Sequence, residues 1–319
     1  MRVYLAKRVA LFIPTLILVT AFVFLILRIV PGDPAIMLLQ GADADEEYTL
    51  EELNAMRAKL GTDRPMYIQY GDWVWKMLRL DFGSSYFYNN PVSEQLVKRF
   101  PITLELTVLA TLLASVVAVP LGVVSAIKQD TLGDYAARII TIAGIALPNF
   151  WVAIMLIFLL VMWFNWLPPL GYADLWERPL TNLQQLIFPA IALGFSNMAF
   201  IARVTRSAML EVFREDYIRT ARSKGLGERA VIYRHALKNA LLPVVTVSGY
   251  EFGRLIGGTV IIEVIFSVPG VGRLLIDSIF HRDFPMIQAT VMIIAVMVLA
   301  LNVALDLVYA WLNPRIRYA

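Results

Sequence analysis

Long apolar runs alternate with polar segments along the chain, and the runs predict helices that cross a membrane. A helix needs about 20 mostly apolar residues to span a bilayer. Six runs reach roughly that length, and none shows the strict alternation of a barrel strand. The runs cover residues 9–30, 102–127, 139–164, 186–204, 240–262 and 286–311. We therefore predict an all-α polytopic membrane protein with six transmembrane helices.

The polar segments complete the predicted domain organisation. It comprises a tail and first transmembrane helix (1–30), an extracytoplasmic cap (31–101), a five-helix membrane core that includes a basic loop at 203–239 (102–311), and a final tail (312–319). The first run is too long for a signal peptide, so we expect it to remain as a helix. Helical spacing in the cap over Leu50–Leu60 and Tyr67–Leu80 predicts two helices. The cap could cover the helix ends or dock a substrate-delivering partner.

The distribution of basic residues predicts the topology. Bases precede the first run and follow the last one, and nine of them lie in the loop 203–239. Cytoplasmic segments of membrane proteins carry an excess of Lys and Arg. With six spans, the two termini and this loop fall on the same side of the membrane, which we identify as the cytoplasm. The net charge of +3 therefore hides a strong asymmetry between the two sides.

Composition excludes most catalytic classes. Hydrophobic residues make up 59% of the chain and charged residues 17%, whereas soluble domains average about 45–50% and about 25%. The chain contains no Cys, no phosphate-binding G-x-x-x-x-G-K-[ST] loop, and only two histidines, His235 and His281, on opposite predicted sides of the membrane. We therefore expect no enzyme, no metal site and no cofactor in this chain. Any energy must come from a partner or an ion gradient.

The loop 203–239 is patterned rather than irregular. Glu215 and Asp216 stand where a helix would begin, since acids are favourable at that end of the helix dipole. Gly225 follows a run of helix formers and is the residue expected at a C-cap. A second helix is expected from Glu228 to Lys238. This helix–glycine–helix element predicts a surface that docks a protein, rather than a loop that only sets topology.

Two features inside the predicted fifth span have alternative interpretations. Glu251 and Arg254 lie one helical turn apart, so they could neutralise each other or line a polar translocation path. Gly253, Gly257 and Gly258 could let another helix approach closely.

The residues of the basic loop resemble a known family. The stretch 215–225, Glu-Asp-Tyr-Ile-Arg-Thr-Ala-Arg-Ser-Lys-Gly, is similar to the EAA-type coupling motif of bacterial ABC importer permeases, in the version found in dipeptide, oligopeptide and nickel permeases. Ala221 and Gly225 match the general E-A-A-x-x-x-G motif, while Arg219 and Thr220 replace its Glu and middle Ala. Stretches similar to the same subfamily lie at 30–35, 60–65, 234–243, 257–263, 268–273 and 313–317.

The resemblance implies a role and a set of partners. The chain would be one of two different permease subunits in the bacterial inner membrane, with two cytoplasmic ATPase subunits that bind ATP and Mg, and a binding protein outside that delivers the substrate. It implies protein partners and contact with the lipid bilayer, and no nucleic-acid partner. Peptides, glutathione and nickel chelates remain open as substrates. Transport would proceed by alternating access.

The resemblance also implies how a coupling helix would meet the ATPase. Apolar contact would come from Tyr217, Ile218, Ala221 and Leu226, and register from Asp216, Arg219, Arg222 and Lys224, with Thr220 on the same helix and Gly225 ending it. The alternatives are a secondary transporter, an intramembrane enzyme and a membrane receptor or scaffold. A secondary transporter would favour inverted repeats and broken midplane helices, which the apolar pattern does not indicate.

Overall fold

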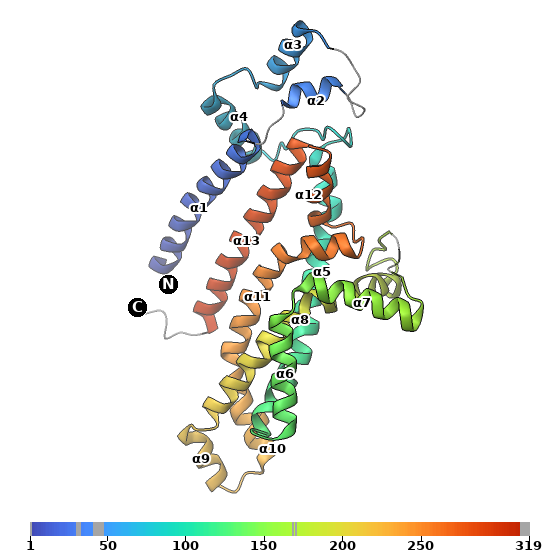
Figure 1. Ribbon diagram of the computed structural model, residues 1–319. Coiled ribbons are helices and arrows are strands. Elements are labelled where there is room, and N and C mark those ends of the chain that lie inside the picture. The colour runs from blue at the N-terminus through green and yellow to red at the C-terminus, as the bar shows by residue number, and fades with distance from the viewer. Residues whose placement is uncertain (1, 30–32, 41–47, 168, 170, 313–319) are drawn as a thin grey trace. The chain divides into compact units, whose positions relative to one another are not determined.

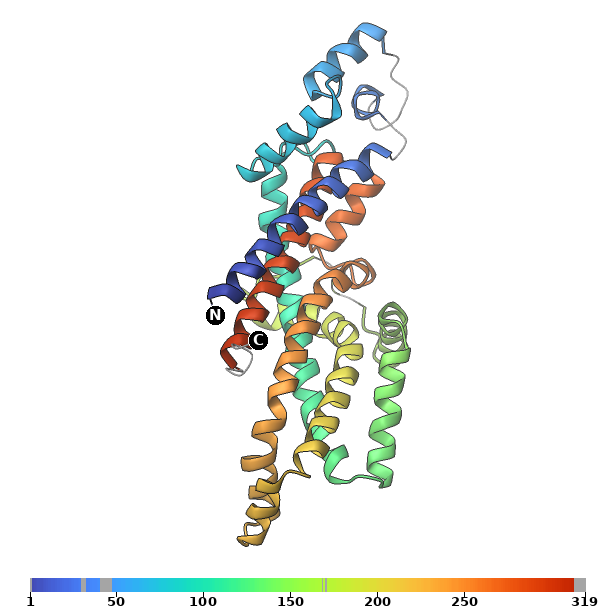
Figure 2. The same ribbon diagram turned by 90° about the vertical axis from the view of Figure 1, so that its left-hand side faces the viewer.

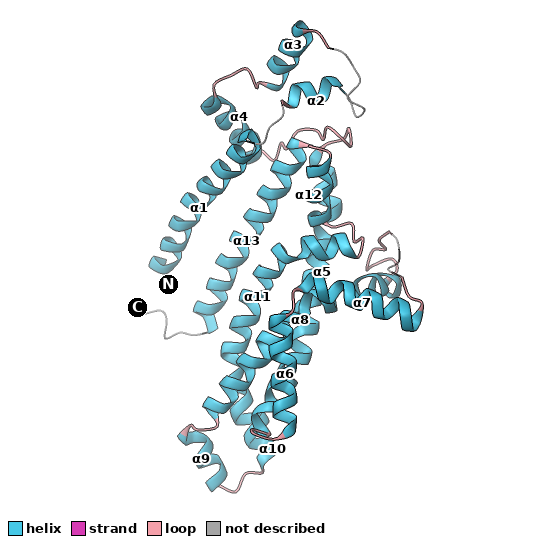
Figure 3. Ribbon diagram, viewed as in Figure 1, coloured by secondary structure: helices cyan, strands magenta, loops and turns pink. Residues whose placement is uncertain are grey.

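The computed structural model describes residues 2–29, 33–40, 48–167, 169 and 171–312, and within them the regular structure is helical (Figure 3). One isolated antiparallel bridge joins Ser84 and Pro91. The helices are α1 (Arg2–Ile29), α2 (Pro34–Gln40), α3 (Leu50–Leu60), α4 (Met66–Leu78), α5 (Val92–Ile127), α6 (Leu132–Ala146), α7 (Asn149–Phe164), α8 (Pro179–Val212), α9 (Asp216–Ser223), α10 (Glu228–Ala230), the π-helical turn η1 (Val231–Ala236), α11 (Leu237–Ile265), α12 (Val271–Phe280) and α13 (Phe284–Leu312).

The described helices confirm an all-helical membrane protein. By length and composition, α5, α8 and the part of α13 up to Leu305 can each cross a bilayer. The helices α6 and α7 reach that length and hydropathy only as a pair. The number of spans and the side on which the termini lie remain predictions. Residues 41–47 of the predicted cap and 313–319 of the predicted tail lie outside the described residues.

The run 139–164 is not one straight helix, so the prediction was wrong there. The helices α6 and α7 meet at an angle of 110°. Leu147 ends α6 with extended backbone (φ −84°, ψ 129°), and Pro148 precedes α7. Proline disfavours the helical conformation in the residue before it and lacks an N–H for the helical ladder. The break therefore follows from Pro148, and α7 packs against α8 beyond it.

Several other helices differ from the apolar runs. The structure extends α5 back to Val92 and α8 to both Pro179 and Val212, because an apolar run marks only the part of a helix that the bilayer could cover. The polar segment between the last two apolar runs contains a further helix, the amphipathic α12. The helix predicted to end at Lys238 instead continues into α11.

The chain folds as two compact units. The first comprises mainly Phe100–Arg273 and Ala300–Ala319, and the second Arg2–Arg99 and Leu274–Leu299. In the first unit α8 packs against α11, α6 and α7, and α8 and α11 run side by side in both views (Figures 1 and 2).

Two close helix approaches in the first unit occur at glycines that the sequence did not single out. A Cβ on Gly194 would lie 2.7 Å from the Ala110 carbonyl oxygen, and one on Gly122 would lie 2.6 Å from that of Ala202. Those glycines fix α5 against α8. At the predicted packing glycines the space is wider: 3.6 Å to the nearest atom at Gly253, 3.7 Å at Gly258 and none within 4 Å at Gly257.

The second unit contains the two predicted cap helices. Thr49 and Glu52 form a capping box at the start of α3, and Gly61 ends that helix with φ 70°. Two aromatic side chains of α4 face α1, since Tyr70 and Trp73 lie with ring centroids 5.4 and 5.9 Å from that of Phe24.

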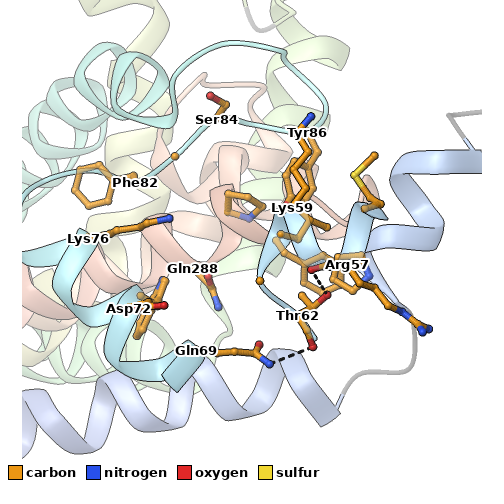
Figure 4. A pocket seen from close by; sticks show the side chains of 18 of the residues that line it. Arg57, Lys59, Thr62, Gln69, Asp72, Lys76, Phe82, Ser84, Tyr86 and Gln288 are labelled. Atoms are coloured by element: carbon orange, nitrogen blue, oxygen red, sulfur yellow. Dashed lines mark hydrogen bonds between the residues drawn. The ribbon is translucent and has the colours of Figure 1, made fainter. Parts of the chain in front are cut away.

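A large pocket with a mixed polar and apolar lining opens in the second unit (Figure 4). Its volume is about 1490 Å³, and it is lined by side chains of both charge signs, among them Arg57, Lys59, Asp72 and Lys76. The amide nitrogen of Gln69 donates to the Thr62 carbonyl at 3.2 Å and holds one wall of the pocket together.

Candidate functional site

The candidate site is α9, the eight-residue helix that follows α8 (Figure 1). The backbone of Glu215 is extended (φ −68°, ψ 144°), and Asp216 occupies the first helical turn. An acid at that position interacts favourably with the positive end of the helix dipole. The local prediction of a helix beginning at Glu215–Asp216 therefore agrees with the structure.

Gly225 terminates this helix through a Schellman motif. The Gly225 N–H donates to the Arg222 carbonyl at 2.9 Å, and the Leu226 N–H donates to that of Ala221 at 3.4 Å. Gly225 itself has φ +77°, and a Cβ there would meet no atom within 4 Å. The requirement for glycine is therefore conformational and not steric, because L side chains are unfavourable at positive φ.

Ile218 and Ala221 are buried in their own chain, which corrects one predicted role. They belong to a cluster built from the ends of α5 and α8 and from the π-helical turn, with Val123, Ala126, Ala208, Met209, Val231, Ile232, Ala236 and Ala240. Since neither side chain is exposed, neither can supply apolar contact to an ATPase subunit. Both anchor α9 to the first unit instead. The sequence could not show this, because the pattern of apolar and polar residues does not say whether the same chain or a partner protein covers the apolar face.

The other predicted contact residues are exposed. Tyr217 and Leu226 keep apolar surface open to a partner, as Thr220 and Lys224 keep polar surface. The Tyr217 hydroxyl accepts a hydrogen bond from the Asn239 amide nitrogen at 2.7 Å, which links α9 to the start of α11. Within the described ranges, α9 thus presents one buried face and one exposed face.

The arginines of α9 hold the turn as well as offering charge. Arg222 pairs with Glu228 across the Gly225 turn, with Nε to Oε1 at 2.9 Å and a terminal nitrogen to Oε2 at 3.4 Å. Arg219 pairs with Asp216 at 3.4 Å. Exposed pairs of this kind contribute about 0.2–1 kcal/mol each. They orient the basic side chains more than they stabilise the fold.

Asp134, which sequence reasoning missed, joins three helices of the first unit. Its side chain is fully buried near the start of α6. The guanidinium of Arg206, on α8, donates to both carboxylate oxygens at 2.9 and 2.8 Å, and Arg138 donates at 2.6 Å. The hydroxyl of Ser125, on α5, donates to the same carboxylate. One acid therefore ties together α5, α6 and α8. An acid four residues before an arginine, a spacing that places both on one face of a helix, was the available signal.

Glu251 and Arg254 form the ion pair that one interpretation of the sequence expected. An Arg254 guanidinium nitrogen lies 2.9 Å from Glu251 Oε2. The two side chains differ in exposure, because that of Glu251 is 3% exposed and that of Arg254 is 59% exposed. The pair therefore places a buried carboxylate under an exposed cation.

Two substitutions separate the buried face of α9 from its exposed face. We expect Ile218→Ala to lower the free energy of unfolding by about 2–5 kcal/mol, because it opens a cavity in the cluster. Tyr217→Ala, on the exposed face, should change it by no more than about 1 kcal/mol, the typical value of one hydrogen bond. Thermal unfolding of the purified protein measures both. An Ile218→Ala protein as stable as the wild type would contradict the assignment of that side chain to the interior.

The chain matches two family models that together cover most of its length. Residues 118–318 match "Binding-protein-dependent transport system inner membrane component", and residues 1–107 match "Binding-prot-dependent transport system membrane comp, N-term".

Curated relatives match over nearly the full chain. It is 40% identical to the dipeptide transport system permease protein DppB of Escherichia coli (strain K12), over 99% of this chain and 98% of that one. It is 39% identical to the di/tripeptide transport system permease protein DppB of Pseudomonas aeruginosa (strain UCBPP-PA14), with the same coverage.

Among solved structures, the fold is similar to that of an amino acid ABC transporter, described as a crystal structure with histidines. The TM-score is 0.51 at 20% identity, over 68% of this chain and 94% of that one. At this identity the likeness concerns the fold alone.

Proposed function

The chain belongs to the family of binding-protein-dependent transport system inner membrane components, and from this premise we propose that it passes peptides through the bacterial cytoplasmic membrane. It is a transport subunit of an ABC importer and not itself an enzyme. The observation that carries the peptide assignment is the similarity to di- and tripeptide permeases at 39–40% identity over nearly the whole chain. Glutathione and nickel chelates become the less favoured substrates.

We propose six spans with both termini in the cytoplasm. The basic residues of α9 and its flanking turns then lie on the cytoplasmic side, as the distribution of Lys and Arg favours. The pocket of the second unit then faces outward. Its mixed charges support a role in receiving the binding protein or its cargo.

Binding-protein-dependent import implies an external binding protein and cytoplasmic ATPase subunits as partners. We propose further that the chain forms a heterodimer with a second permease subunit, above two ATPase subunits. ATP and Mg would bind in those ATPase subunits, and this chain would bind no cofactor.

The exposed face of α9 is the proposed ATPase contact. Tyr217, Thr220, Lys224 and Leu226 would enter a cleft of the ATPase subunit, while Arg219 and Arg222 set the register. Because Ile218 and Ala221 fix α9 to the ends of α5 and α8, a displacement of α9 would be transmitted to both helices. Those helices would then alternate between inward and outward access.

A growth assay tests the proposal. A bacterial strain that lacks its dipeptide permease gene and cannot make one amino acid is supplied with that amino acid only as a dipeptide. Expression of this chain with its own binding protein, second permease and ATPase subunits should restore growth. Growth should fail when the ATPase subunits carry a substitution that abolishes hydrolysis. Growth that persists with the inactive ATPase would favour a secondary transporter instead.

A further inference from the structure

One face of α11 is exposed and carries an arginine in the middle of an otherwise uncharged stripe. Tyr250 is 63% exposed and Ile261 54%, and the Arg254 side chain is 59% exposed. Gly257 lies between Arg254 and Ile261, and a Cβ on it would meet no atom within 4 Å. Steps of four, three and four residues place all four positions on the same face of a helix.

The contacts of α11 place this stripe beside two helices that can cross a bilayer. A Cβ on Gly258 would lie 3.7 Å from a Leu193 methyl group, and Leu193 is near the middle of α8, a helix long and apolar enough to cross the membrane. On the other side of the stripe, Gly249 meets Leu305 of α13, a second such helix. Arg254 falls between these two contacts along α11.

An arginine beside two such helices does not face lipid. Ionisable side chains within membrane segments are energetically costly there, and they face a bundle interior or a water-filled cavity. Since the Arg254 side chain is exposed in the single chain, the space it faces is either a partner protein or an aqueous path. A Cβ on Gly257, one turn from Arg254, would meet no atom within 4 Å, so no described part of this chain covers that position.

Glu251 pairs with the guanidinium by charge, at one of its terminal nitrogens. Arginine has five N–H groups in a planar fork, so one edge can hold one carboxylate and another edge a second. Within the described residues, the ion pair of Arg254 is the one with Glu251 at 2.9 Å. Because Glu251 is buried, it positions the cation from beneath and leaves the outer edge of the fork toward the open face.

We propose that Arg254 is a carboxylate-binding residue of the translocation path, and that the face formed by Tyr250, Arg254, Gly257 and Ile261 lines that path. The inference rests on the proposed function, because it takes peptides as the cargo. The proposed ligand is the side-chain carboxylate of an acidic peptide, a group that a guanidinium fork can bind through two parallel hydrogen bonds. Tyr250, one turn away, offers a hydroxyl and an aromatic ring to the same molecule. Glu251 acts as a positioning residue for the arginine.

Uptake of two isosteric dipeptides tests the proposal. Ala-Glu and Ala-Gln differ by one carboxylate, and their uptake is measured in proteoliposomes that contain the whole importer, with the same binding protein throughout. Relative to wild type, Arg254→Glu should lower the Ala-Glu to Ala-Gln uptake ratio about tenfold, as expected for loss of one charge-assisted hydrogen bond. Arg254→Gln should lower it several-fold. Arg254→Lys keeps the charge and should restore most of the ratio.

Arg178→Gln is the matched control, since Arg178 is an exposed arginine that lies just before α8 and not on α11. It should leave the ratio unchanged. An unchanged ratio in both Arg254→Gln and Arg254→Glu, even with lower total uptake, would make Arg254 a contact to another subunit and overturn the inference alone. Wild-type importer that takes up neither dipeptide would overturn the proposed function and this inference with it.

Discussion

Asp134→Ala is expected to cost about 3 kcal/mol of stability and to abolish most transport, because it leaves two arginines without their shared carboxylate. Removing one partner of a buried ion pair costs about 3–5 kcal/mol. The lower end applies here, since the Arg138 side chain is 38% exposed and that of Arg206 is 21% exposed. The loss should also uncouple α6 from α8, which Arg206 joins through Asp134. Thermal unfolding and peptide uptake measure the two effects.

Asp130→Asn is the matched control for this substitution. Asp130 is also an acid paired with Arg138, at 3.0 Å, but its side chain is 65% exposed. Exposed pairs contribute about 0–1 kcal/mol, so this protein should unfold near the wild-type temperature and transport normally. Equal effects of the two substitutions would contradict the claim that the buried carboxylate organises this end of the first unit.

Gly225→Val should lower uptake about tenfold or more while the protein still inserts in the membrane. An L residue in the left-handed conformation costs about 1–2 kcal/mol, and a β-branched one is a genuine outlier there. That cost falls on the turn that ends α9 and returns the chain toward α11. The orientation of the exposed face of α9 would change, and the proposed ATPase contact with it. Uptake per membrane-inserted molecule is the quantity to measure.

Two controls isolate the conformational cause. Gly227→Ala should have little effect, because Gly227 has ordinary φ of −62° and equally open surroundings. Gly225→Asn should retain more uptake than Gly225→Val, since Asn tolerates the left-handed region. Equal losses in Gly225→Val and Gly225→Asn would show that side-chain bulk, and not backbone conformation, matters at this turn.

The local structure of α9 could be predicted from the sequence because it depends on neighbouring residues. An acid in the first turn and a glycine past the last turn are helix signals within one short stretch. The same holds for the cap helix Leu50–Leu60, whose capping box is local to Thr49 and Glu52. The prediction of a membrane protein rests on the lengths of the apolar runs, which are also a local property of the sequence.

Features that depend on distant residues could not be predicted in this way. Asp134 and Arg206 are 72 residues apart, and no periodicity relates them. Ile218 is apolar in the sequence whether its own chain or a partner covers it. A close backbone approach occurs at Gly194, which meets α5, while the Gly253-x-x-x-Gly257 pattern marks a looser contact.

The sequence also left two interpretations of Glu251 and Arg254 open, and the structure shows the ion pair that the first of them expected. The residues do pair, as neutralisation requires. Only the Glu251 side chain is buried, whereas that of Arg254 is exposed. That difference depends on how α11 packs against α8 and α13, which spacing along one helix cannot reveal.

Reconstitution into proteoliposomes tests the central claim most directly. Peptide uptake is measured with the binding protein outside and ATP inside, for the full importer, for the full importer with a non-hydrolysable ATP analogue, and for this chain alone. We expect uptake only in the full importer with hydrolysable ATP. Peptide uptake by this chain alone, driven by an ion gradient, would contradict its assignment as the permease subunit of an ATP-driven importer.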